Sequence, residues 1–166
     1  MATTTGGIPV LVTGQHERIG QPVCKALLPE ISAVHFTLVA HIEEELPLLL
    51  AGERPNPPNN SVVTPGKWEP ESNPPVALLL GGAYTDEMVQ NLRASSGYGP
   101  DDVVAKGSSP TAPRRIPWIK IDSAKSTLGP QDPGYSADVV RRLKQAVLKL
   151  QADGKLDGQH CELYAV

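Results

Sequence analysis

Short, unbroken apolar segments recur along this chain, and stretches with helical periodicity separate them. Residues 8–13 (IPVLVT), 34–40 (VHFTLVA), 76–80 (VALLL) and 118–121 (WIKI) are mainly apolar and do not alternate with polar residues. Continuous hydrophobicity of this kind is typical of strands buried on both faces, as in a parallel sheet covered by helices. We therefore expect a parallel sheet, with residues 161–166 as its last strand.

Between these predicted strands, apolar residues recur at helical spacing. This spacing predicts helices over residues 19–28, 42–50, 85–93 and about 136–150. Thr85 and Ser136 are expected to be the N-caps of the last two helices, because a hydroxyl side chain accepts hydrogen bonds from free helix N–H groups. Strands that alternate with helices predict right-handed crossovers. The expected fold class is α/β, a three-layer Rossmann-like sandwich of about five mostly parallel strands.

Proline and glycine are abundant, with 17 and 15 residues in a chain of 166. Most of the prolines fall in two regions, residues 52–75 and 95–117, which we interpret as long loops. Within the first loop, only residues 61–64 are candidates for a short edge strand. The chain length favours a single domain over residues 1–166, with these two loops on its surface.

Charge and cysteine content exclude several classes of protein. A net charge of −3 gives no reason to expect nucleic acid or an anionic membrane as partner. No apolar run is long enough to span a membrane, and no basic residue precedes the first apolar segment, which disfavours a signal peptide. Cys24 and Cys161 form no disulfide or metal motif, so we expect no metal. The expectation is a cytoplasmic protein, with a size and apolar content compatible with a homodimer.

The turn between the first strand and the first helix reads Thr13-Gly14-Gln15-His16-Glu17-Arg18-Ile19-Gly20. This turn resembles the dinucleotide-binding start of the short-chain dehydrogenase/reductase superfamily, whose extended and atypical branches carry TGxxGxxG. The matching residues are Thr13, Gly14, Ile19 and Gly20, and the similarity covers roughly residues 8–40. The resemblance implies an NAD(P) site in which backbone N–H groups approach the pyrophosphate. The cofactor-binding residues would be Gly14, Gln15, Arg18, Ile19 and Gly20, with His41 after the second strand.

The chain also departs from that superfamily. Glu17 stands where the middle glycine belongs, so it adds bulk and negative charge near the expected phosphates, which Arg18 would partly offset. The catalytic Tyr-x-x-x-Lys pair is absent, and the chain is too short for the usual substrate-binding half. The expected protein is therefore a shortened, atypical relative without classical reductase chemistry. A turn that persists from ancestry without binding any cofactor is the alternative.

Polar side chains follow several of the predicted strands, at the edge where parallel α/β sheets bind ligands. The candidate catalytic residues are His16, Glu17, Tyr84, Asp86 and Asp122, which together offer acid–base chemistry. The alternative is structural, with Asp86 at a helix start, Asp122 in a turn and His16 as a solvated loop residue. Three functions stay open. They are a small-molecule-binding protein that holds a nicotinamide dinucleotide, a cofactor-free isomerase, cyclase or lyase, and a non-catalytic regulatory or interaction module.

Overall fold

The computed structural model describes residues 7–55, 60–95, 116–129, 131–156, 160 and 162–166. Five strands form one parallel sheet in the order β2-β1-β3-β4-β5. The strands are β1 (Ile8–Gly14), β2 (Ile31–Leu38), β3 (Leu78–Leu80), β4 (Trp118–Lys120) and β5 (Leu163–Ala165). Strand order reverses between β1 and β3. From β1 the chain goes to β2 on one side of β1, and afterwards it returns to add β3, β4 and β5 on the other side of β1.

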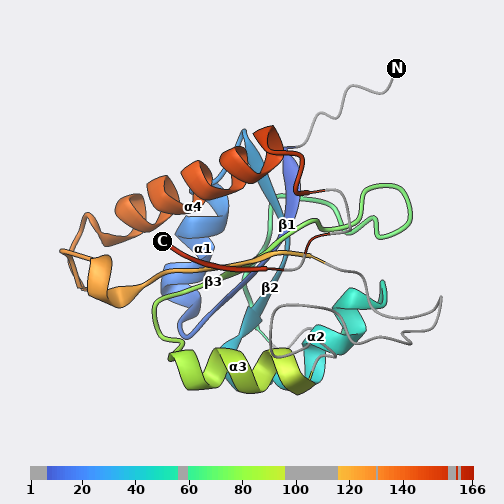
Figure 1. Cartoon of the computed structure of the whole chain (residues 1–166), viewed down its shortest axis with the longest axis horizontal. Helices are drawn as coiled ribbons and strands as arrows, with labels where there is room; N and C mark the ends of the chain where they lie inside the picture. Colours follow the sequence, from blue (N-terminus) through green and yellow to red (C-terminus); the bar gives the residue numbers. More distant parts are fainter. Residues whose placement is uncertain (1–6, 56–59, 96–115, 130, 157–159, 161) are drawn as a thin grey trace.

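Two layers of helices enclose the sheet, as Figure 1 shows. Helices α1 (Glu17–Ala26) and α4 (Tyr135–Ala152) pack on one face. Helices α2 (Ile42–Leu50) and α3 (Asp86–Ser95) pack on the other. Two short 3-10 helices, η1 (Val39–His41) and η2 (Ser123–Lys125), follow β2 and β4. The predicted three-layer α/β Rossmann-like sandwich is confirmed.

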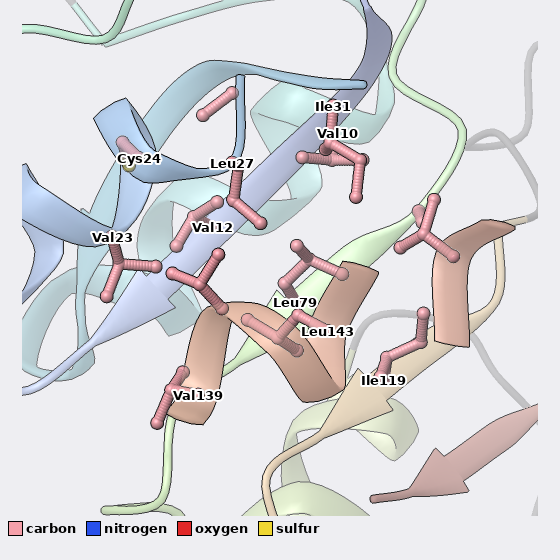
Figure 2. Close-up of a cluster of buried hydrophobic side chains, with 14 of the residues drawn as sticks. Val10, Val12, Val23, Cys24, Leu27, Ile31, Leu79, Ile119, Val139 and Leu143 are labelled. Atoms are coloured by element: carbon pink, nitrogen blue, oxygen red, sulfur yellow. The ribbon is translucent and has the colours of Figure 1, made fainter. Parts of the chain in front are cut away.

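Adjacent residues of each strand point to opposite faces and build two separate cores. In β1, Val10 and Val12 face α1 and α4, whereas Leu11 faces α2 and α3. In Figure 2, side chains of β1, β3 and β4 meet Val23 of α1, Leu27 directly after α1 and residues of α4 in the first core. Both faces of the sheet are buried, which explains why the strands read as continuous apolar runs.

The predicted loop of residues 52–75 covers the free edge of β2 where the structure describes it. The N–H of Gly66 donates to the carbonyl of Ala33 at 2.9 Å, and the Asn60 side chain donates to the carbonyl of Phe36 at 2.9 Å. An added Cβ at Gly66 would lie 2.4 Å from Ser32 Oγ, so only glycine allows this approach. The loop therefore blocks further strand pairing at this edge without being a strand, and residues 61–64 form none.

Two local predictions can be compared directly with the helix termini. Thr85 caps α3, since its Oγ1 accepts from the N–H of Met88 at 3.1 Å, and this prediction is confirmed. The prediction for Ser136 was wrong, because α4 begins at Tyr135 with Gly134 as its N-cap. The helix thus starts two residues earlier than the Ser136 hydroxyl suggested, and the Tyr135 ring in its first turn is buried in the core. Cys161 and residues 96–115 lie outside the described residues.

No helix in the described ranges combines the length and apolar character that crossing a membrane requires.

Candidate functional site

A pocket of about 340 Å³ opens at the carboxyl ends of β1 and β3 on the α1/α4 face. In doubly wound α/β folds this crevice, where strand order reverses, is where ligands bind. The turns after both strands, the loop that follows β4, and helices α1 and α4 form its walls. The described lining residues are Val12, Thr13, Gly14, Gln15, His16, Ile19, Gly20, Val23, Phe36, Leu79, Leu80, Gly81, Gly82, Ala83, Ser123, Ser126, Leu128, Gly129, Tyr135, Val139 and Leu143.

The first turn forms one wall of this pocket. Of the residues that the sequence singled out, Gly14, Gln15, His16, Ile19 and Gly20 line the pocket together. His16 is the N-cap residue of α1, but its side chain makes no capping hydrogen bond. A Cβ at Gly20 would lie 2.3 Å from the Phe36 ring, whereas a Cβ at Gly14 would lie 3.8 Å from the same ring. Gly20 is thus required for helix-to-strand packing.

Glu17 does not obstruct the first turn, although the sequence placed its charge near the expected phosphates. Its carboxylate turns away from the pocket and accepts hydrogen bonds from the N–H and the hydroxyl of Ser61, each at 2.5 Å. These hydrogen bonds lower the pKa of Glu17 below its ordinary value. One turn later, the Gln21 carboxamide bonds both the N–H and the carbonyl of Val63 at 2.8 Å. Glu17 and Gln21 therefore attach the loop of residues 52–75, called the proline-rich loop below, to α1.

The opposite wall comes from residues that the sequence analysis did not select. Ser123, Ser126 and Leu128 reach the pocket from the loop after β4, and Tyr135 and Val139 reach it from α4. Tyr135 is almost fully buried, and burial raises the pKa of its phenol, opposed by the charge of Arg142 and assisted by Asp138. A Gly-Gly pair directly after the third predicted strand was the available sequence signal for a pocket here.

A buried arginine holds this wall in position. Arg142 of α4 donates to Ser126 Oγ at 2.7 Å and to Asp138 at 3.0 Å. It also donates to the backbone oxygens of Asp122 at 2.9 Å and Val166 at 2.6 Å. One guanidinium thus ties α4 to the loop after β4 and to the chain after β5. Its planar fork of five donors is suited to several acceptors at fixed angles.

The remaining predicted site residues lie outside the lining of the pocket. Tyr84 is buried on the α2/α3 face, where its hydroxyl bonds Thr13 Oγ1 at 2.6 Å and burial raises its pKa. Asp86 is exposed and lies 3.7 Å from the Lys120 ammonium. Asp122 accepts from the N–H of Ala124 at 3.0 Å and caps η2. Arg18 and His41 are not lining residues either.

The chemistry of the pocket follows from this distribution. Among the described lining residues none is Asp, Glu, Lys or Arg. His16 and Tyr135 are the lining groups with acid–base capacity, and no hydrogen bond joins them in the described part of the chain. Within those same ranges, no cluster of three His, Cys, Asp or Glu side chains could hold a metal ion.

The fold and site together define a doubly wound α/β protein with a small, mostly apolar pocket at its topological switch point. The chain is 34% identical over 161 residues to "Kojic acid related protein 6" of Aspergillus oryzae, across 93% of this chain and 87% of that protein. It belongs to the family of that protein. No family model matches the sequence, and no solved structure matches it.

Proposed function

We propose that this protein binds a small, uncharged and largely apolar organic molecule in the pocket between the first turn and α4. The observation that carries the proposal is a pocket of about 340 Å³ at the switch point, with no carboxylate, ammonium or guanidinium among its described lining residues. Small-molecule sites are mostly apolar clefts of about 300–1,000 Å³ with a few placed polar groups. This pocket lies at the lower end of that range.

A nicotinamide dinucleotide is the second candidate, and a specific observation favours it. Glu17 is turned toward Ser61, so the N-terminus of α1 is open to an anionic group, as in proteins that bind pyrophosphate there. The resemblance of the first turn to the short-chain reductases also supports this second proposal. It is carried by Thr13, Gly14, Ile19 and Gly20. We rank it second because the pocket extends toward α4 and not toward His41 and the end of β2.

Catalysis without a cofactor and a regulatory role both rank lower. An acid–base enzyme needs a titratable pair that can share a proton at the reacting atom. His16 lines the pocket, but no hydrogen bond to a second titratable side chain is found for it in the described ranges. An interaction module requires an exposed apolar face more than an enclosed cavity. The name of the A. oryzae protein relates it to kojic acid, a small ring compound, which agrees with the first proposal.

Thermal denaturation with millimolar probes tests these alternatives. The probes are kojic acid, toluene, NADH and NADPH, because a ligand that binds only the native state raises the melting temperature. We expect kojic acid or toluene to stabilise the protein. A shift with NADH or NADPH alone would favour the dinucleotide instead, and no shift with any probe would overturn both proposals.

A matched pair of variants locates the binding site. Ala83 is exposed at the pocket wall, so Ala83→Trp is expected to close the pocket and to abolish the shift. Ala124 is equally exposed but does not line the pocket, so Ala124→Trp should respond as the wild type does. Equal shifts for Ala83→Trp and the wild type would show that the probes bind elsewhere.

A further inference from the structure

Three hydroxyl groups gather at the α4 end of the pocket, on Ser123, Ser126 and Tyr135. Gly82 lies between two of them, since an added Cβ there would be 3.1 Å from both Ser123 Oγ and the Tyr135 hydroxyl oxygen. The missing side chain at Gly82 therefore lets both hydroxyls approach the same point of the backbone. The rest of the lining near α1 and the sheet is apolar, with Val12, Ile19, Phe36 and Leu79 among its residues.

The Ser123 hydroxyl already uses its one proton in a hydrogen bond within the protein. Its Oγ donates its proton to the carbonyl of Gly82 at 2.8 Å. A serine hydroxyl has one proton and two lone pairs, so Ser123 can offer a ligand only an acceptor. A ligand group that meets Ser123 must therefore carry a proton, as a hydroxyl does.

The hydroxyls of Ser126 and Tyr135 can instead donate a hydrogen bond to a ligand. Ser126 Oγ accepts from Arg142 at 2.7 Å, which leaves its own proton free to donate. The Tyr135 hydroxyl has no hydrogen-bond partner within the described part of the chain, and burial raises its pKa. Tyr135 is consequently a neutral phenol at physiological pH with a proton to donate. A ligand group that meets these two residues must supply an acceptor oxygen.

We infer that the pocket selects an uncharged ring compound in which a hydroxyl group stands beside a carbonyl oxygen. The ligand hydroxyl donates to Ser123 Oγ, and the carbonyl oxygen accepts from the Tyr135 hydroxyl, with Ser126 as a further donor. The apolar residues hold the ring. This inference rests on the proposed function, because it assigns the ligand class of that same pocket. A carboxylate or phosphate would find no cationic side chain among the described lining residues to offset the loss of water.

Isothermal titration with three probes tests the inference. Kojic acid has the required hydroxyl beside a carbonyl, its deoxy analogue has hydrogen in place of the ring hydroxyl, and toluene has neither group. We expect kojic acid to bind about tenfold more tightly than the deoxy analogue, which is the effect of one lost hydrogen bond. Equal affinity of the two pyranones would overturn the inference.

Variants assign each ligand group to its partner. Ser123→Ala should weaken kojic acid about tenfold and leave the deoxy analogue unchanged, whereas Tyr135→Phe should weaken both to a similar degree. Neither substitution should change the affinity for toluene. Tyr164→Phe is the matched control, because it removes a phenol hydroxyl from β5, outside the lining of the pocket, and should leave the affinity for kojic acid unchanged.

The outcomes separate this inference from the function on which it rests. Toluene binding that Ala83→Trp abolishes, together with kojic acid affinity insensitive to Ser123→Ala and Tyr135→Phe, would overturn the ligand class but keep the small-molecule pocket. No binding of toluene or of either pyranone would overturn the proposed function itself. Unfolding free energies of Ser123→Ala and Tyr135→Phe should stay within about 1.5 kcal/mol of the wild type, because neither substitution removes apolar packing and Ser123→Ala removes one hydrogen bond, to the Gly82 carbonyl.

Discussion

Two residues in the first turn, Glu17 and Gly20, have different physical reasons for their identity. Gly20 lets α1 approach the Phe36 ring of β2, and its missing side chain also leaves part of the pocket open. Glu17 stands at a position where the resemblance predicts glycine, and its side chain binds Ser61. A glycine pattern therefore has to be interpreted position by position.

We predict that Gly20→Ala destabilises the protein and that Gly14→Ala does not. At Gly20 the added Cβ would lie 2.3 Å from the buried Phe36 ring, so α1 and β2 must separate. The cost of overpacking, about 1–3 kcal/mol, exceeds the gain in helix propensity of about 1 kcal/mol. At Gly14 the corresponding distance is 3.8 Å, an ordinary contact, and we expect a change within about 0.5 kcal/mol. Urea denaturation of both variants measures the difference, and equal stabilities would contradict the packing argument.

At the level of elements, α4 connects the fold to the site. Its apolar stripe fills the first core, while Arg142 on the same helix fixes the loop after β4 that carries Ser123 and Ser126. The pocket wall therefore depends on a helix whose own sequence looks like an ordinary amphipathic segment. Loss of Arg142 should affect both stability and ligand binding.

We predict that Arg142→Lys costs about 3 kcal/mol in the free energy of unfolding. A lysine has one ammonium group and cannot reproduce hydrogen bonds to four acceptors, which leaves buried acceptors without partners. Arg141→Lys is the matched control, because Arg141 is exposed and bonds Asp138 alone, at 2.6 Å. For this surface pair we expect a change within about 0.5 kcal/mol. Chemical denaturation compares the two, and similar losses would show that Arg142 has no special role.

The attachment of the proline-rich loop to α1 gives a pH-dependent prediction. The hydrogen bonds from Ser61 lower the pKa of Glu17, so they stabilise the folded loop above the ordinary glutamate pKa and are lost as the pH falls through the lowered value. The chemical shift of the Ser61 amide proton should therefore follow the titration of Glu17 in acid. Glu17→Gln should abolish this titration, whereas Glu53→Gln, on the same long loop, should preserve it. A Ser61 shift that still titrates in Glu17→Gln would refute the assignment.

Across the whole molecule, the two faces of the sheet differ in polarity. The α1/α4 face holds the pocket, whereas the α2 side of β2 buries a polar group in which His35 and Thr37 bond Glu45 Oε1 at 3.1 and 3.0 Å. Trp68 from the proline-rich loop packs against His35, with ring centroids 6.2 Å apart, and Arg54 lies over the Trp68 ring. Burial lowers the pKa of His35, Glu45 opposes this effect, and Arg54 reinforces it.

The lowered pKa of His35 predicts how global stability depends on pH. The unfolded chain takes up a proton on this histidine near its ordinary pKa of about 6.5, before the folded protein does, so unfolding is favoured as the pH falls. Between neutral pH and about pH 5 the free energy of unfolding should decrease, and it should decrease less in His35→Gln. Guanidinium denaturation at several pH values measures both slopes. Parallel slopes would show that His35 does not contribute.

The sequence by itself determined the fold class, the approximate positions of the helices and strands, though not the start of α4, and one wall of the pocket. Continuous apolar runs, helical spacing and the Thr13–Gly20 turn are local patterns, and local patterns report burial and backbone conformation directly. The tertiary structure alone decided the partner of Glu17, 44 residues away in the chain, and the wall formed by Ser123, Ser126 and Tyr135. These contacts depend on strand order and on how a helix far along the chain packs across the sheet, which no local periodicity specifies.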